Sequence, residues 1–185
     1  SAGPSFDLGY AKELAYKFRR KAASGAMHGQ FVEGSVSIRG FAYVLDRVCR
    51  RAAPGDDIFR RFVDLGAGIG NAVIAAHALF PFRECTGVEL VPDYVKRSHD
   101  RAVKYMESDN FYRSKGARTD AENILVQGDF LNEVDWSDAS VVFCNAVTWP
   151  TPIIDQVATL ALRLRPRAVF MLLGFNKFFP SQEVL

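Results

Sequence analysis

The sequence predicts a doubly wound α/β domain with a mostly parallel sheet and a helical attachment at its N-terminal side. Three observations lead to this fold class. Residues 62–71 read as a strand, a glycine-rich turn and the start of a helix, the layout of a crossover unit in which backbone and ligand approach closely. Beyond this turn, strand-like and helical patterns alternate. Residues 123–127 and 140–144 are nearly continuous apolar runs, as in parallel strands covered on both faces.

Length, charge and cysteine usage limit the class of protein. At 185 residues, with 49% hydrophobic and 24% charged residues, the chain fits one folded domain with a proper core. Its net charge of +2 gives no global basic field for nucleic acid. Cys49, Cys85 and Cys144 are scattered without metal-ligand spacing, which is typical of reduced thiols in an intracellular protein. No apolar run reaches the ~18 residues of a membrane span, so we expect neither a metal site nor a membrane segment.

Two helices are expected ahead of the glycine turn. Apolar residues at helical spacing predict the first over residues 4–23. We interpret its basic end as a solvated helix terminus, with a nucleic-acid contact as the less favoured alternative. A loop over residues 27–35 follows and is placed to cover a bound cofactor. Ser35 or Ser37 can cap the second helix, whose apolar face is formed by Ile38, Phe41, Leu45 and Val48.

Strands and helices alternate from the glycine turn onward. We expect further strands over residues 84–89, 123–127, 140–144 and 168–173. Helices are expected over residues 72–79, from Pro92 to Met106, and over residues 153–164, with a loop over residues 109–120. The predicted organisation is therefore a helical attachment with a covering loop over residues 1–58 and a core over residues 59–185.

Polar and aromatic residues follow four of the predicted strands. They occupy residues 66–71, Glu89, residues 128–130 and residues 145–149. Ligands of open parallel sheets bind beyond the carboxyl ends of the strands, so these four places are expected to meet at one pocket.

The glycine turn predicts the kind of ligand. Gly66, Gly68 and Gly70 stand at every second position with Asp64 two residues ahead, which differs from the Gly-x-Gly-x-x-Gly of dinucleotide enzymes. Glu89 is placed to accept hydrogen bonds from the ribose hydroxyls of an adenosine ligand. The Asp64 carboxylate suits a ligand with a positive end, so we predict S-adenosylmethionine. The alternative is a tight turn with an unrelated surface acid.

The two later strand ends predict the rest of the pocket. Asp129 can accept from the exocyclic amine of adenine while Phe130 lies against the ring, the alternative being an exposed turn with a core phenylalanine. The Asn145 side chain offers an amide donor and a carbonyl acceptor in one fixed geometry, and Trp149 can wall a narrow apolar slot. The alternative here is an asparagine turn anchored by a tryptophan.

Together these motifs resemble the disruptor-of-telomeric-silencing family, the histone lysine methyltransferases that lack a SET domain. The resemblance covers about residues 28–179 and rests on residues 31–35, residues 62–71, Gly87-Val88-Glu89, Gly128-Asp129-Phe130, Val142-Phe143-x-Asn145 with Trp149, and residues 176–179. It implies a class I S-adenosylmethionine-dependent methyltransferase of Rossmann-like, seven-stranded type, located in the nucleus.

The resemblance also implies roles for individual residues. The cofactor, released as S-adenosylhomocysteine, would be bound by Phe31, Val32, Glu33, Asp64, Gly66, Ala67, Gly68, Gly70, Asn71, Glu89, Asp129, Phe130 and Asn145. The catalytic set would be Phe31, Asn145 near the transferred methyl, and Trp149 in the wall of a lysine channel. Four departures from the family pattern put the shape of that channel in question: Phe31, Val32, Ala146 and Pro150.

The implied reaction is methylation of a lysine side chain, with nucleosomal histone H-three as the expected substrate and nucleic acid met only through the nucleosome. Desolvation in an apolar channel would favour the neutral amine, because no residue is an obvious dedicated base. Three alternatives stay open: a methyltransferase for another protein, RNA or a small amine; a cofactor-binding module without turnover; and, disfavoured by the glycine spacing, a nicotinamide oxidoreductase.

Overall fold

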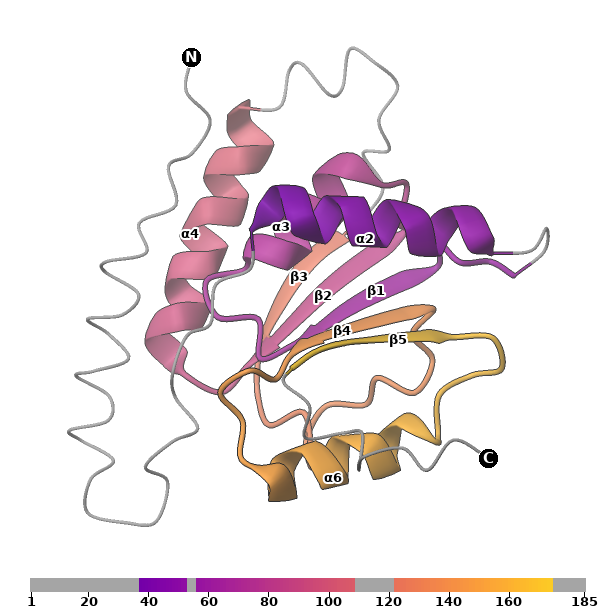
Figure 1. The fold of residues 1–185 in the computed structure, drawn as a ribbon. Helices are drawn as coiled ribbons and strands as arrows, with labels where there is room; N and C mark the ends of the chain where they lie inside the picture. Colours follow the sequence, from indigo (N-terminus) through magenta and orange to yellow (C-terminus); the bar gives the residue numbers. More distant parts are fainter. Residues whose placement is uncertain (1–36, 53–55, 109–121, 175–185) are drawn as a thin grey trace, which may run out of the picture.

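The computed structural model describes residues 37–52, 56–108 and 122–174, drawn in colour in Figure 1. Five parallel strands form one sheet in the order β3-β2-β1-β4-β5. They are β1 (Arg61–Leu65), β2 (Glu84–Glu89), β3 (Glu122–Gln127), β4 (Val141–Asn145) and β5 (Val169–Leu173). Because every pair is parallel, all five carboxyl ends lie at the same edge of the sheet, which we call the carboxyl edge, opposite the amino edge.

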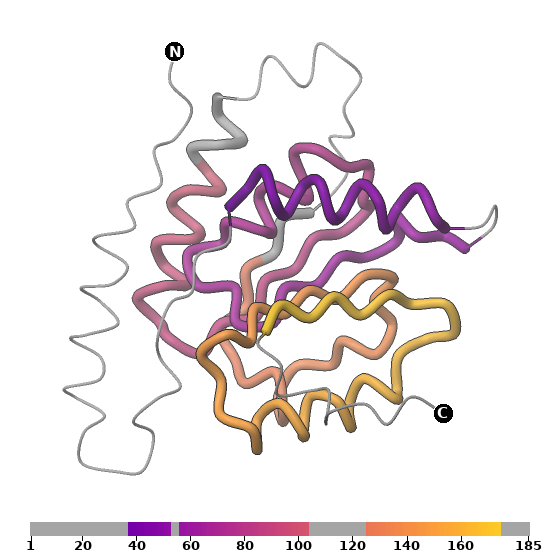
Figure 2. The backbone as a smooth tube through the Cα atoms, in the orientation of Figure 1, coloured from indigo at the N-terminus to yellow at the C-terminus, as the bar shows by residue number. Residues whose placement is uncertain are grey.

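The order of the strands reverses between β1 and β4. The chain runs from β1 outward to β2 and β3 on one side, then returns to start β4 on the other side of β1 and continues to β5, a path that Figure 2 traces. In this register Asp64 of β1 lies between Gly87 of β2 and Phe143 of β4. A reversal of this kind leaves a crevice at the carboxyl edge, where ligands of open α/β sheets bind.

Helices cover both faces of the sheet (Figure 1). One face carries α2 (Ile38–Arg51), α3 (Asn71–Leu79) and α4 (Pro92–Ser108), and the other carries α6 (Thr151–Ala161). The helix starts have local causes. The Ser37 hydroxyl accepts a hydrogen bond from the Gly40 amide at 3.4 Å and caps α2, and Pro150 precedes α6 with a second proline in its first turn.

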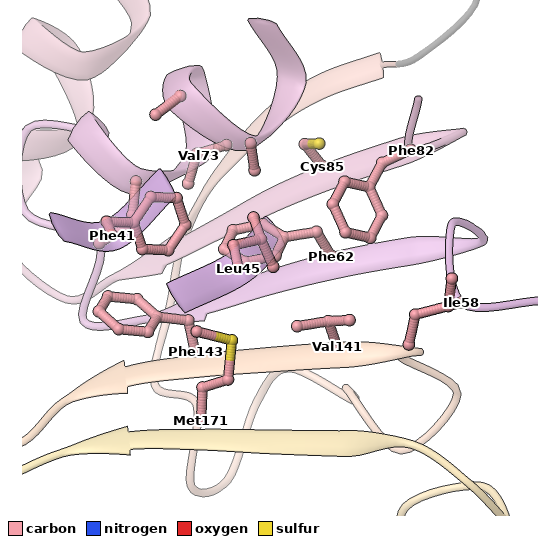
Figure 3. Packing of buried hydrophobic residues seen from close by; sticks show 14 residues of the cluster. Phe41, Leu45, Ile58, Phe62, Val73, Phe82, Cys85, Val141, Phe143 and Met171 are labelled. Carbon is pink, nitrogen blue, oxygen red and sulfur yellow. The ribbon is translucent and has the colours of Figure 1, made fainter. Parts of the chain in front are cut away.

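A separate hydrophobic core lies on each side of the sheet. Figure 3 shows the one beneath α2 and α3, where Phe41 makes edge-to-face contacts with Phe143 at 5.0 Å and with Phe62 at 5.9 Å between ring centroids. The other core joins the opposite face of β1 and β4 to α6 and includes Trp136 and Trp149. Since α2 contributes Phe41 and Leu45 to the first core, it packs as part of the same folded unit as the sheet.

The predicted fold class is confirmed, and the expected strands and helices occur within one to three residues of their predicted bounds. The helix expected over 153–164 begins at Thr151, where the prolines favour a start, and ends at Ala161, after which Leu162 is 87% exposed. Two further strands of the expected seven-stranded sheet are not among the described residues. The first predicted helix and the loops over 27–35 and 109–120 also lie outside them.

Candidate functional site

Printed contacts join four strand ends at the carboxyl edge into one constellation. The Gly68 amide after β1 donates to Glu89 Oε2 at 2.8 Å, and the Gly128 amide after β3 donates to the Glu89 carbonyl at 3.0 Å. The ring of Phe130 stacks on the indole of Trp149, with centroids 4.9 Å apart and 17° between the planes. Four chain segments that are distant in sequence therefore meet at the crevice between β1 and β4.

The glycine turn needs glycine both for its backbone conformation and for close contacts. Gly66, Gly68 and Gly70 have φ of +73°, +56° and +80°, a region that side chains other than glycine rarely adopt. A Cβ on Gly70 would lie 2.0 Å from the hydroxyl of Ser98, and one on Gly66 would lie 2.9 Å from Cζ2 of Trp149. The turn thus presents backbone at the start of α3, with no room for a side chain at Gly66 or Gly70.

Two acids stand behind this turn. Asp64 is 4% exposed, and burial raises the pKa of its carboxyl to about 8, with the neighbouring Glu89 carboxylate adding to the rise. Burial also raises the pKa of Glu89, against the lowering effect of hydrogen bonds from the amides of Val91, Gly68 and Leu90. A buried acid beside a half-buried one, with no cation next to Asp64 among the described residues, suits a positively charged ligand.

Asp129 and Phe130 form a well-ordered turn after β3. The two carboxylate oxygens of Asp129 accept hydrogen bonds from the Leu131 amide and from Asn132 Nδ2, both at 2.8 Å. Each oxygen keeps a second lone pair, so the group can still accept from an exocyclic amine. Phe130 is half-buried, with one ring face covered by Trp149.

The segment after β4 brings an amide and an aromatic ring to the same edge. Asn145 ends the strand opposite Leu173 and is partly exposed. A turn closed by the Trp149 amide on the Ala146 carbonyl, at 3.0 Å, then returns the indole beneath Gly66. Trp149 is 9% exposed, so most of its surface packs against Phe130, the glycine turn and the core on the α6 side.

The other sequence-predicted residues divide into two groups. Ala67 lies in the glycine turn, where its amide donates to the Val88 carbonyl at 3.0 Å, and Asn71 is the first residue of α3, with a buried Oδ1 that has no partner among the described residues. Phe31, Val32 and Glu33 lie outside the described residues, as do residues 176–179. The structure therefore describes the candidate residues at the strand ends, and the covering loop remains a prediction.

The sequence analysis assigned no role to three residues that support the turns at the strand ends. The Trp136 indole donates to the Phe130 carbonyl at 2.9 Å, and the Glu133 carboxylate accepts from the Asp129 amide at 2.9 Å. Gly87 lets the glycine turn rest on β2, because a Cβ there would lie 2.8 Å from both Ala67 and Val73. Of these contacts, the one between Asp129 and Glu133 could have been inferred from the sequence, because the two residues are four positions apart.

The described residues also form a pocket of about 240 Å³ behind this turn, beside the end of α6. It is lined by residues 130–137, Leu160 and Arg163, away from the glycine turn and from Asn145. This pocket lies behind the Asp129–Phe130 turn and is separate from the crevice at the strand ends.

Among the residues that the structure describes, no group of three or more His, Cys, Asp or Glu side chains gathers to hold a metal ion. No described helix is long and apolar enough to cross a membrane.

A reversed parallel sheet with a glycine turn after its central strand and an acid at the end of the next is a Rossmann-like arrangement, and the comparisons with known proteins identify it as the class I S-adenosylmethionine-dependent methyltransferase fold. Solved structures share it. SAM-bound CalS10, an amino pentose methyltransferase from Micromonospora echinaspora, matches at TM-score 0.54 and 21% identity, covering 98% of this chain and 61% of that one. A methyltransferase from Clostridium acetobutylicum matches at 0.53 and 13%, covering 86% and 55%. YjhP from E. coli matches at 0.51 and 19%, covering 76% and 50%.

The chain belongs to the DOT1 histone methylation protein family, whose model matches residues 46–181. No curated protein matched the chain. The chain spans about half to three fifths of the three structural relatives above, which at these identities show the fold alone.

The residues of this site fit S-adenosylmethionine, the cofactor of the family and the fold. Asp64 is a buried acid whose pKa is raised by burial and by the Glu89 carboxylate, and the ligand brings a cationic amino acid end that would favour its ionised form. The glycines of the turn at the start of α3 allow close approach of a ligand carboxylate, and Glu89 and Asp129 supply acceptors for hydroxyl and amine groups.

Proposed function

We propose that this protein transfers a methyl group to the side-chain amine of a lysine in another protein, with nucleosomal histone H-three as its substrate. The observation that carries the proposal is the convergence of the glycine turn, Glu89, the Asp129–Phe130 turn and the Asn145–Trp149 segment at one edge. Membership of a histone methylation family supports the choice of acceptor, and a nuclear location follows from it.

The cofactor half of the proposed site uses three kinds of contact. Asp64 and the turn around Gly68 would hold the methionine end, Glu89 the ribose, and Asp129 with Phe130 the adenine. When bound, S-adenosylmethionine supplies a methyl group on a sulfonium centre, an electrophile that needs no further activation. The protein then has to fix the direction of approach and keep water out, which together contribute most of the acceleration in such transfers.

We propose that Asn145, Trp149 and Phe31 form the part of the site that receives the acceptor lysine. Asn145 would position the amine or the methionine end through its amide and would not take a proton. The lysine must lose its proton before it attacks, and we assign no dedicated base to this step. Desolvation beside a cationic centre lowers the pKa of an ammonium group, so an apolar channel walled by Trp149 would favour the neutral amine.

Methyl transfer from a radiolabelled donor onto three acceptors tests the proposal. Nucleosomes, free histones and bulk RNA are incubated in parallel with the wild-type chain and with Asn145→Ala, and the labelled product is identified by mass spectrometry. Label on a histone lysine, lost in the variant, supports the proposal. Label on RNA alone would replace it with an RNA methyltransferase. Cofactor binding without any label would replace it with a binding module.

A further inference from the structure

The turn after β3 holds every polar group of Asp129 in a hydrogen bond. The Asp129 amide donates to Glu133 Oε2 at 2.9 Å, and the Asp129 carbonyl accepts from the Glu133 amide at 2.8 Å, so the two residues bond each other reciprocally. The two carboxylate oxygens of Asp129 accept from the Leu131 amide and from Asn132 Nδ2, both at 2.8 Å. The direction of the Asp129 side chain is therefore defined by its neighbours, and Glu133 bonds both of its backbone polar groups.

The end of β3 leaves space for the Glu133 carboxylate. A Cβ on Gly128 would lie 3.4 Å from Glu133 Oε2 and 3.0 Å from Cγ2 of Val134. Any side chain at position 128 would crowd the acid, so glycine lets the carboxylate lie against the backbone that leaves the strand. Glu133 thus reaches the residue that directly follows Gly128, which is Asp129.

The bond from the Asp129 amide to Glu133 lies at the surface. Glu133 is exposed, and an amide that loses an exposed partner can bond to water instead, so this contact contributes little to the free energy of folding. A bond of the same kind closes the next turn of the loop, where the exposed carboxylate of Asp135 accepts from the Ser137 amide at 2.9 Å. What Glu133 adds is therefore mainly the direction of Asp129.

The aromatic ring beside this carboxylate is also held from two sides. The Trp136 indole donates to the Phe130 carbonyl at 2.9 Å, and Trp149 covers one face of the Phe130 ring, with centroids 4.9 Å apart. An acceptor and an aromatic plane in fixed relative positions can recognise both a flat base and a donor on its edge. Adenine offers such a donor in its exocyclic amine, whereas a base without that amine leaves the carboxylate without its partner.

We propose that Glu133 is a positioning residue that makes the site selective for a base with an exocyclic amine. It acts through Asp129, whose carboxylate would accept from that amine, and it touches no ligand itself. Without Glu133 the Asp129 side chain gains freedom to turn away, so the amine contact weakens while stacking on Phe130 is kept. The inference rests on the proposed function, because it assumes that Asp129 and Phe130 hold the adenine of the cofactor.

The test is isothermal titration calorimetry of the whole chain with S-adenosylhomocysteine and with its analogue that carries hydrogen in place of the exocyclic amine. The two ligands share the ring nitrogens, the ribose and the amino acid end, so the ratio of their affinities measures the amine contact. The wild-type chain should prefer S-adenosylhomocysteine by about tenfold or more, as expected for a hydrogen bond to a charged group. In Glu133→Ala this preference should fall by about fivefold, while affinity for the analogue changes by less than about twofold.

Two control variants separate positioning from other effects. Glu133→Gln keeps an acceptor for the Asp129 amide and should keep the wild-type preference. Asp135→Ala removes the matched exposed acid of the next turn and should leave the preference unchanged. Thermal melting should show that all three variants are folded, with melting temperatures within a few degrees of the wild type.

The results separate failure of this inference from failure of the proposed function. A wild-type chain that binds neither ligand, or both equally, would remove the proposed adenine contact and the inference with it. A wild-type preference that survives in Glu133→Ala would overturn the inference alone. So would an equal loss of affinity for both ligands, or a Glu133→Ala chain that does not fold, since Glu133 would then serve only the structure. Loss of preference in Glu133→Gln would also overturn it, because charge and not the hydrogen bond would be responsible.

Discussion

The carboxyl and amino edges of the sheet differ in whether their buried ionisable group has a counter-charge beside it. At the carboxyl edge, Asp64 is 4% exposed with a pKa raised to about 8. At the amino edge, Arg61 has a side chain that is only 14% exposed, yet it is held by Glu84 at 2.8 Å and by Asp138. Both groups sit at ends of β1 and both are largely withdrawn from water. Only the one at the amino edge has its counter-charge within the described protein.

The contrast separates residues that serve stability from residues prepared for a ligand. A buried charge with its partner contributes to folding, whereas a buried acid without one holds a proton that it would otherwise lose. Glycines with positive φ gather at the same edge as the uncompensated acid, and the ion pairs gather at the other, together with Asp57 and Arg167, the described residues other than glycine that have positive φ. The glycines leave the carboxyl edge open to close approach of a ligand, whereas the positive φ of Asp57 and Arg167 accompanies ion pairs that close the fold.

Of the variants at the carboxyl edge, Gly68→Arg should lower cofactor affinity the most. Its φ of +56° disfavours any side chain, and an arginine would fill the space proposed for the methionine end. Backbone strain of about 1–3 kcal/mol corresponds to about 5–150-fold, and the steric block by the arginine side chain adds to it, so cofactor affinity in calorimetric titration should fall by about 100-fold or more.

Gly40→Arg is the matched control, because Gly40 lies on the exposed side of α2, where an added Cβ would make only ordinary contact with Ser37, at 3.8 Å. It introduces the same side chain and should bind the cofactor like the wild type. If Gly68→Arg retained wild-type affinity, the glycine turn would not be the binding site.

Asn145→Ala should affect turnover more than binding. Asn145 ends β4 at the crevice, and loss of a positioning contact typically lowers a transfer rate by about 10–100-fold. Cofactor affinity, measured by titration on the same preparation, should change by less than about threefold. Equal losses in rate and affinity would place Asn145 in the cofactor pocket and away from the transferred methyl.

Asp64→Asn should remove most of the pH dependence of cofactor affinity. In the empty site Asp64 is protonated below pH about 8, and a cationic ligand favours the ionised form, so binding releases a proton. Wild-type cofactor affinity should therefore rise by up to about tenfold per pH unit between about pH 6 and 8 and then level off. The variant should bind about tenfold more weakly at pH 8 and lose most of this slope. Calorimetry in buffers of different ionisation enthalpy counts the proton.

The same variant should be more stable without cofactor. The pKa of Asp64 is raised in the folded state from its ordinary value of 3.8 to about 8, so the folded chain holds a proton that the unfolded chain releases in this interval. The free energy of unfolding therefore falls as pH rises from about 4 to 8. Asp64→Asn removes this loss, and thermal melting at pH 7.5 should show a melting temperature about 2–4 °C higher or more. A lower melting temperature would mean that Asp64 has a counter-charge in the folded chain.

Arg61→Gln, at the amino edge, should lower the stability of the fold and leave cofactor binding unchanged. It leaves Glu84 and Asp138 without their shared partner and should lower the free energy of unfolding by about 1–2 kcal/mol. Chemical denaturation measures the loss, and cofactor affinity should stay unchanged. The more exposed Arg167→Gln should cost less than about 0.5 kcal/mol. A large fall in cofactor affinity in Arg61→Gln would show that the two edges are coupled.

Much of the fold was predictable because its signals are local. The apolar run into Asp64, the glycines that follow and the apolar helix after them identify β1, the turn and α3 without any knowledge of neighbours. The strands over 84–89 and 123–127 were predicted closely for the same reason, and parallel pairing then brings Glu89 and Asp129 to one edge. The first helix and the covering loop with Phe31 and Glu33 stay predictions, since they lie outside the described residues.

What the sequence by itself determined is the order of the elements and the chemical character of each strand end, because backbone preference and hydrophobic periodicity act over a few residues. Only the tertiary structure decided that Trp149 lies buried against Phe130, that Trp136 supports this turn, and that Arg61 has two acids beside it while Asp64 has no cation beside it in the described part of the chain. These properties depend on groups up to 77 positions apart in the chain. Burial and charge pairing are set by neighbours in space, and no local pattern encodes them.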